Sequence, residues 1–288
     1  MPLAVAMAMT APAAHANAGA TVRHWAPPGI STPMFESHGA FDPRRGDFYF
    51  VRSSPAFKGW RIMTSHCGKD GWSTPVDAGF AGDGVEADPF FTPDGRWLYF
   101  ISNRSTDGIR HQDLDIWRVQ RDADGHWGEP QRLPAPVNSR AQEWFPRPAA
   151  DGWLYFGSGR PGGRGRTDIW RARRDAGGDW RVENLGPAVN TTDDEYEALP
   201  SPDGRRLVVM ASDGLYLSLR GNDGRWGPRH KLGPEVDANG SEIGAAFSPS
   251  GRSLLFARDT RGPLSGEFFV WQPEGAEDWP PACPAAER

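Results

Sequence analysis

Short apolar runs recur along the chain at nearly regular intervals, and each follows a tight-turn sequence. The turns combine Asp, Pro, Ser and Gly, which accept the backbone dihedrals that a hairpin requires. They lie at residues 41–43, 93–95, 151–152, 202–204 and 249–251. The apolar runs that follow occupy residues 48–50, 98–100, 154–156, 207–209 and 254–256. Runs this short, separated by so many turns, predict β-strands rather than helices.

A glutamate stands upstream of every turn, at an almost constant distance from the apolar run. Glu36, Glu86, Glu143, Glu195 and Glu242 precede their runs by 12, 12, 11, 12 and 12 residues. After a second, Gly-rich turn each unit carries a tryptophan: Trp72, Trp127, Trp180, Trp226 and Trp279. Four short antiparallel strands in about fifty residues are typical of one β-propeller blade.

The repeats therefore predict an all-β fold, a five-bladed β-propeller of four-stranded antiparallel blades. The approximate blade boundaries are 36–80, 81–135, 136–187, 188–235 and 236–280, within a single domain at 20–288. A ring must join its last blade to its first, because it otherwise leaves open sheet edges. Trp25 lies 11 residues before Glu36, much as Trp72 lies 14 residues before Glu86. We therefore predict that the N-terminal strand, within residues 22–30, completes the fifth blade and closes the ring.

Two cysteines lie on opposite sides of this predicted seam. Cys67 ends the third strand of the first blade, and Cys283 follows the last tryptophan. Because the first and fifth blades are neighbours in a closed ring, the positions predict a Cys67–Cys283 disulfide, with two free thiols as the alternative.

The first 16 residues are mostly small and apolar, and 14–16 read Ala-His-Ala, which fits a signal-peptidase site. A basic n-region is missing, since the first arginine is Arg23. We interpret 1–16 as a signal peptide with a truncated n-region, with a disordered Ala-rich leader as the alternative. The expected location is therefore periplasmic or secreted.

Charge and motifs narrow the classes of function. The 32 basic and 37 acidic side chains give a net charge of −5, which argues against nucleic-acid binding through a basic face. Beyond the leader no run of eighteen apolar residues occurs, so no membrane span is expected. Zinc, P-loop and Rossmann motifs are absent from the sequence.

The repeat sequence resembles the TolB-like propellers, the Pro-Asp-Gly relatives of the WD-repeat blades. The resemblance rests on Ser-Pro-Asp-Gly at 201–204 before an apolar strand, and on 98–104 and 154–160, which lead to Asp-Ile-Trp at 115–117 and 168–170. It covers about residues 36–272. Two features depart from the family pattern: such propellers commonly have six or more blades, and the fourth unit lacks both the arginine and Asp-Ile-Trp. The resemblance implies the fold, and a family that includes protein-interaction platforms and enzyme-associated modules.

Two sets of side chains are candidates for a site. If the five repeated glutamates face inward, their carboxylates ring one mouth of the channel, where they could hold a divalent cation such as calcium; the alternative is that each glutamate locks its blade through backbone N–H groups. Loop arginines are expected at the same face, where they could bind an anionic or hydroxyl-rich ligand: Arg104, Arg110, Arg160 and Arg164.

The second set lies two residues beyond each glutamate and does not repeat: His38, Asp88, Phe145, Glu197 and Gly244. Asp88 and Glu197 could act as an acid/base pair, because like charges in a confined channel raise one pKa.

Two readings of function follow. The favoured one is an exported, monomeric, non-catalytic propeller that presents its loop face to a protein or glycan partner and needs no cofactor. The alternative is a carbohydrate-active enzyme, a glycoside hydrolase or lyase, using Asp88 and Glu197 with His38 and Glu143. Sugar hydrolysis requires two carboxyl groups in an open pocket, so a plugged channel argues against this alternative.

Overall fold

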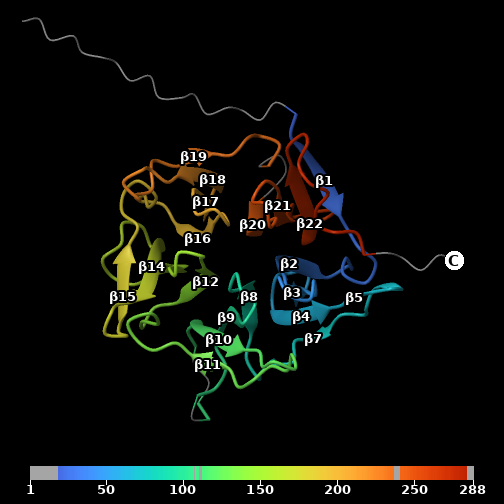
Figure 1. The fold of residues 1–288 in the computed structure, drawn as a ribbon, viewed down its shortest axis with the longest axis horizontal. Helices are drawn as coiled ribbons and strands as arrows, with labels where there is room; N and C mark the ends of the chain where they lie inside the picture. The colour runs from blue at the N-terminus through green and yellow to red at the C-terminus, as the bar shows by residue number, and fades with distance from the viewer. Residues whose placement is uncertain (1–18, 107, 110–111, 237–240, 284–288) are drawn as a thin grey trace, which may run out of the picture.

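A computed structural model of the 288-residue chain describes residues 19–106, 108–109, 112–236 and 241–283. The predicted signal peptide at 1–16 and Arg110 lie outside the described residues. The described elements are β-strands, and they form five four-stranded antiparallel sheets arranged in a ring (Figure 1). The five-bladed propeller predicted from the repeats is therefore confirmed.

Each blade runs outward from the channel in chain order. Blade one is β2 (Phe35–Phe41), β3 (Phe48–Ser53), β4 (Arg61–Ser65) and β7 (Val76–Asp77). Blade two is β8 (Glu86–Phe91), β9 (Trp97–Ser102), β10 (Asp115–Gln120) and β11 (Gln131–Arg132). Blade three is β12 (Glu143–Pro148), β13 (Leu154–Ser158), β14 (Asp168–Arg174) and β15 (Trp180–Asn184). Blade four is β16 (Glu195–Pro200), β17 (Arg206–Ala211), β18 (Gly214–Leu219) and β19 (His230–Lys231).

Blade five combines both ends of the domain. Its inner strands are β20 (Ser241–Phe247), β21 (Leu254–Asp259) and β22 (Glu267–Gln272), and its outer strand is β1 (Thr21–Trp25). β1 pairs antiparallel with β22 from Thr21 opposite Gln272 to Trp25 opposite Phe268. The predicted closure by the N-terminal strand is therefore confirmed.

A disulfide joins Cys67 to Cys283 across the same seam, as predicted. Cys67 begins a small hairpin that projects from blade one, β5 (Cys67–Gly68) with β6 (Gly71–Trp72). The bond holds the C-terminal tail against blade one, and Trp279 of this tail is buried and contacts Phe41 with ring centroids 5.6 Å apart.

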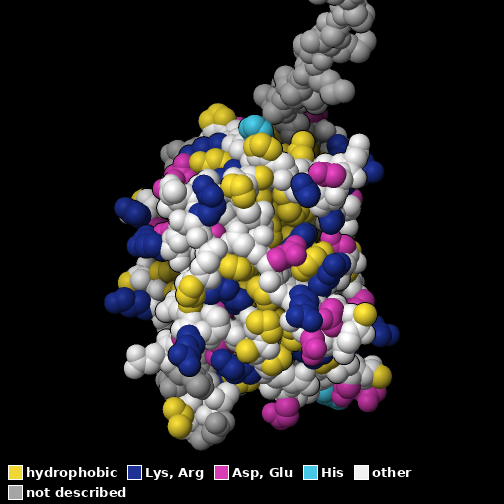
Figure 2. Space-filling view, turned by 90° about the vertical axis from the view of Figure 1, so that its left-hand side faces the viewer, with side chains coloured by type: hydrophobic (Ala, Val, Ile, Leu, Met, Phe, Trp, Pro, Cys, Tyr) yellow, Lys and Arg dark blue, Asp and Glu magenta, His cyan; other side chains and the backbone are white. Residues whose placement is uncertain are grey.

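The core consists of five apolar layers, one between each pair of neighbouring blades. Leu98 and Phe100 of β9 face blade one, for example, whereas Tyr99 and Ile101 lie in the layer shared with blade three. Both faces of a blade are thus covered, so the second strands are apolar at successive positions instead of alternating. This is why the sequence shows short continuous apolar runs. On the outer side seen in Figure 2, basic and acidic side chains are interspersed with apolar ones.

Every inner strand contains a β-bulge near its centre. The register shifts lie between Ser37 and Ala40, and at the corresponding place in the other four blades. His38, Asp88, Phe145 and Gly244 lie in these bulges with positive φ angles of 48° to 63°. A bulge bends its strand and redirects a side chain. It thereby brings the non-repeated layer of residues together on the channel axis.

The described part of the chain contains no helix with the length and apolar character needed to cross a bilayer.

Candidate functional site

The repeated glutamates fasten each inner strand to the loop that leads into it. All five carboxylates are buried. Glu36, for example, accepts hydrogen bonds from the Thr32 hydroxyl at 2.6 Å and from Arg52 Nε at 2.8 Å. Glu143 accepts from the Ser139 hydroxyl at 2.6 Å in the same way. The residue four positions before the glutamate thus lies within reach of its carboxylate, which is the blade-locking arrangement.

An arginine completes the clamp and binds the same incoming loop a second time. Arg104 contacts the Glu86 carboxylate and donates to the Phe80 carbonyl at 3.1 Å. Arg160 lies 3.1 Å from the Glu143 carboxylate and donates to the Val137 carbonyl. Arg52 and Arg258 make the corresponding contacts in blades one and five. In each case the carbonyl belongs to the residue six positions before the glutamate.

These contacts correct two expectations. The glutamates were expected to line the channel mouth in the binding interpretation, but their carboxylates are directed to the loops. Arg104 and Arg160 were expected on an exposed rim, but Arg104 is buried and the Arg160 side chain is only 9% exposed. Burial raises the pKa of all five glutamates except Glu242, for which only the contact is described, and the neighbouring arginines oppose this shift for Glu36, Glu86, Glu143 and Glu195.

The remaining arginine of the predicted rim is solvent-exposed. The backbone N–H of Arg164 donates to Asp168 Oδ2 at 2.8 Å, which fixes the loop between β13 and β14.

The non-repeated layer forms a closed cluster on the channel axis. His38 Nε2 lies 3.3 Å from Asp88 Oδ1, and the backbone N–H of Phe145 donates to Asp88 Oδ2 at 2.8 Å. The rings of His38 and Phe145 are 5.1 Å apart. Gly244 leaves no room for a side chain, because a Cβ atom there would lie 2.6 Å from His38 Cα. We call these residues, together with Glu197 and Arg147, the channel plug.

Arg147 supplies the positive charge of the plug and was not predicted from the sequence. Its Nε donates to Glu197 Oε1 at 2.9 Å, while the Ala245 N–H donates to Glu197 Oε2 at 3.2 Å. The guanidinium carbon lies 4.6 Å from the centre of the Phe90 ring. Four residues after the glutamate, the other blades have Ala, Phe, Leu and Ala, so a charged side chain at this position was the available signal.

Burial shifts the two titratable groups of the His38–Asp88 contact in opposite directions. Desolvation raises the pKa of Asp88 to about 7, and the positive charge of Arg147 only partly offsets this. Desolvation, aided by the same positive charge, lowers the pKa of His38 to about 3. At neutral pH and below, the contact is therefore one between a neutral imidazole and a largely protonated carboxyl group.

The plug changes the interpretation of the candidate catalytic residues. His38, Asp88 and Glu197 are 4%, 2% and 1% exposed, and Glu143 is fully buried in its clamp. All four carboxylate oxygens of Asp88 and Glu197 already have a protein partner. The open pocket expected between two carboxyl groups is therefore not found at these residues, since the channel is filled by side chains here.

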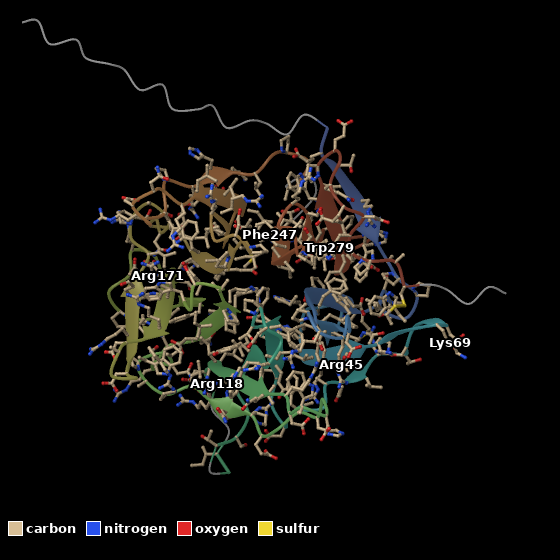
Figure 3. The ribbon with its side chains drawn as sticks, in the orientation of Figure 1. Arg45, Lys69, Arg118, Arg171, Phe247 and Trp279 are labelled. Carbon is tan, nitrogen blue, oxygen red and sulfur yellow. A yellow bond between two sulfur atoms is a disulfide. The ribbon has the colours of Figure 1, made fainter. Side chains whose placement is uncertain are left out.

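A depression of about 520 Å³ lies at the end of the channel where the inner strands finish. All five blades contribute to its lining, chiefly through prolines and aromatic rings. Phe247 of β20 and Trp279 of the tail lie next to each other at this end (Figure 3). The tail thus covers part of the mouth, and the wall that remains is predominantly apolar.

Comparison with known proteins agrees with the fold. TolB from Acinetobacter baumannii superposes with a TM-score of 0.50 at 16% identity, covering 90% of this chain and 65% of that one. A protein described as a TolB from Agrobacterium tumefaciens superposes with a TM-score of 0.51 at 18% identity, covering 83% of this chain and 77% of that one. The chain thus has a β-propeller fold similar to that of TolB proteins.

Sequence comparison reaches less far. An uncharacterized protein of Agrobacterium fabrum is 32% identical over 88 residues, which cover 29% of this chain and 26% of that protein. The chain therefore spans about a quarter of the curated relative it matches. No protein-family model matches the chain.

Proposed function

We propose that this protein is an exported, non-catalytic β-propeller that binds a protein or glycan partner through the ends of its ring. The observation that carries the proposal is the channel plug. Asp88 and Glu197, the carboxyl groups that hydrolysis at the channel would need, are 2% and 1% exposed and are held by protein donors. Side chains committed to one another in this way support a rigid scaffold rather than proton transfer to a substrate.

Export is supported by the disulfide between Cys67 and Cys283. Disulfides persist in oxidising compartments and are rare in the cytosol of mesophiles. The similarity of fold to TolB proteins agrees with this location, and it is the basis for favouring a protein partner over a glycan.

The first test is a panel of oligosaccharides and sugar lactones incubated with the purified protein and with an Asp88→Asn variant. Asn tolerates the left-handed backbone of this position, so the variant is expected to fold. We expect no turnover by either protein. Turnover by the wild type that disappears in the variant would establish the carbohydrate-active alternative instead.

Location is tested separately by fractionating cells and alkylating the denatured, unreduced protein. We expect the chain in the periplasmic or secreted fraction with both cysteines resistant to alkylation. Recovery in the cytosol with two reactive thiols would contradict export.

A further inference from the structure

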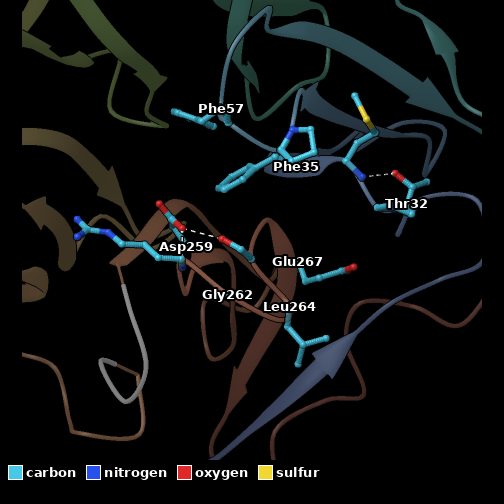
Figure 4. A pocket seen from close by; sticks show the side chains of 13 residues that line it. Thr32, Phe35, Phe57, Asp259, Gly262, Leu264 and Glu267 are labelled. Atoms are coloured by element: carbon cyan, nitrogen blue, oxygen red, sulfur yellow. Dashed lines mark hydrogen bonds between the residues drawn. The ribbon is translucent and has the colours of Figure 1, made fainter.

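A second cavity lies at the opposite end of the ring, where blade one meets blade five. It has a volume of about 630 Å³ and is lined by the loops before and after β2 and β3 and by the loop between β21 and β22. Phe35 and Phe57 lie on one side of it, and Asp259 and Leu264 lie on the other (Figure 4). We call it the seam cavity. It has no counterpart in the repeat pattern, because its lining residues are not repeated between blades.

Backbone strain is concentrated around this cavity. Among the described residues, six residues other than glycine have positive φ angles, and three of them belong to the channel plug. The other three are Phe57 at 56°, Arg261 at 52° and Leu264 at 63°, and all three line the seam cavity. This conformation is unfavourable for bulky side chains and is normally given to Gly or Asn. Such strain clusters at binding sites, where it holds particular side chains in place.

Local hydrogen bonds hold both loops in these conformations. The Phe57 N–H donates to the Ser54 carbonyl at 2.8 Å. Asp259 Oδ1 accepts from the Arg261 N–H at 2.9 Å and from the Ser265 hydroxyl at 2.6 Å. The strained side chains are thereby presented before any ligand arrives.

The cavity also exposes apolar side chains that the fold does not cover. Met34 is 39% exposed and Leu264 is 51% exposed, and they are two of the five large hydrophobic residues that are exposed in the described chain. Their flexible or branched aliphatic side chains suit the side chain of a peptide. They lack the flat face on which a sugar ring stacks, and Phe35 is only 3% exposed.

The charges at the rim favour an acidic partner. Lys58 and Arg261 are exposed, and neither side chain has an ion-pair partner among the described residues. The nearby carboxylates are engaged, because Asp259 holds its own loop and Glu267 accepts from Ser31 and lies 3.4 Å from His24. The uncompensated charge at the cavity is therefore positive.

We propose that the seam cavity docks a peptide segment of a protein partner in which a bulky apolar residue adjoins Asp or Glu. This proposal rests on the proposed binding function and specifies its site and ligand. The apolar residue contacts Met34 and Leu264, and the neighbouring carboxylate contacts Arg261 or Lys58.

A displayed library of random dodecapeptides, selected on the immobilised full chain, tests this proposal. We expect enrichment of peptides that place Leu, Ile, Met or Phe beside an acidic residue. A synthetic peptide from this pool should lose about tenfold or more in affinity with Leu264→Asp, since a central apolar contact dominates such sites. Arg261→Asp should lower its affinity severalfold and weaken the dependence of binding on salt.

Two matched controls separate the cavity from general surface effects. Leu219→Asp changes an apolar residue that is 58% exposed in blade four, and Arg225→Asp changes an exposed arginine of the same blade. Both should leave the affinity within about twofold. Asp is tolerated at positive φ, so all four variants are expected to fold, and thermal unfolding verifies this.

Each outcome decides a different point. Enriched peptides that bind Leu264→Asp as well as wild type would overturn the seam cavity as the site while leaving protein binding intact. Basic enriched peptides would overturn the proposed ligand chemistry. Failure to enrich any peptide, together with binding of oligosaccharides on a glycan array, would overturn the protein partner itself.

Discussion

Arg229 Nη2 lies 2.8 Å from Glu195 Oε1, although Arg229 comes from a different part of its blade than the arginine of every other clamp. In the other four blades the arginine follows or ends the second strand, as Arg104 does in blade two. The corresponding position of blade four is occupied by Asp213. Arg229 approaches from the loop before β19 instead, and also donates its backbone N–H to the Ala188 carbonyl at 3.2 Å. The clamp is thus preserved by its charge and not by its position in the repeat.

Replacement of Arg229 should therefore destabilise the whole ring. Arg229→Ala leaves the buried Glu195 carboxylate without its cation, and removal of one partner of a buried ion pair costs about 3–5 kcal/mol. We expect a loss in the lower part of this range, because the Thr191 hydroxyl and N–H still donate to Glu195 at 2.7 and 3.0 Å. Urea denaturation measures the loss. Arg225→Ala, at an exposed arginine of the same blade, should change the midpoint by less than about 0.5 kcal/mol.

Gly244 should be the least replaceable glycine of the channel. Gly244→Ala combines a φ of 63° with a Cβ that would lie 2.6 Å from His38 Cα, so the strand itself must move. Gly152→Ala is the matched control, because its φ is 83° but no atom lies within 4 Å. The control should cost about 1 kcal/mol for the left-handed backbone alone, and Gly244→Ala should cost about 1–3 kcal/mol more. Equal losses in chemical denaturation would contradict the tight plug.

The repeat made much of this architecture predictable. Constant spacing between Glu86 and its apolar run, and the same spacing in four other places, defines the blades before any contact is known. The Trp25 spacing likewise predicts the closure, because a propeller has only one open seam. The layer of His38, Asp88 and Glu197 followed from their shared offset from the glutamates.

The direction of side chains was not predictable in the same way. The repeat places Glu86 and Arg104 at one end of the ring, but whether they face the channel or the incoming loop depends on the bulge and on the contact between them. The seam cavity is harder still, since Phe57 and Leu264 belong to loops without a repeat and only the backbone angles distinguish them. Non-repeated loops carry no periodic signal from which such a site can be inferred.

The plug should respond to pH through Asp88 and His38 with opposite signs. The folded-state pKa of Asp88 is raised to about 7, so the folded protein binds more protons than the unfolded chain between about pH 4 and 7, and Asp88 makes stability fall as pH rises through this window. The folded-state pKa of His38 is lowered to about 3, so His38 makes stability rise with pH between about 3 and 6.5. The two contributions largely cancel in the wild type between about pH 4 and 6.5.

Asp88→Asn removes one contribution and leaves the other. We expect the stability of the variant relative to wild type to increase from pH 4 to pH 7, by up to about 4 kcal/mol for a shift of about three pKa units. Urea denaturation at intervals of half a pH unit measures this difference. Curves that stay parallel across the window would show that Asp88 is ionised in the folded protein.

Reduction of the disulfide should loosen the seam. The bond between Cys67 and Cys283 joins residues 216 positions apart, and loss of a native disulfide from a small domain typically costs about 2–5 kcal/mol. The double variant Cys67→Ser/Cys283→Ser should show this loss in the absence of reductant. Hydrogen exchange should increase first in β1 and in the tail around Trp279, because the bond holds the tail against blade one. A uniform increase across all five blades would instead indicate that the seam is no weaker than the rest of the ring.

Strain at the seam cavity predicts a substitution that stabilises the fold while weakening binding. Leu264 is 51% exposed, so Leu264→Gly removes little buried apolar area, and its φ of 63° is favourable for glycine. We expect the free energy of unfolding to rise by about 1 kcal/mol. Leu219→Gly is the control, because Leu219 is equally exposed but ends a regular strand, where glycine should cost about 0.5–1 kcal/mol. The two substitutions should thus change the urea midpoint in opposite directions. Loss of stability in both would mean that Leu264 is held in place for packing, and the reason to interpret its strained backbone as part of a binding site would disappear.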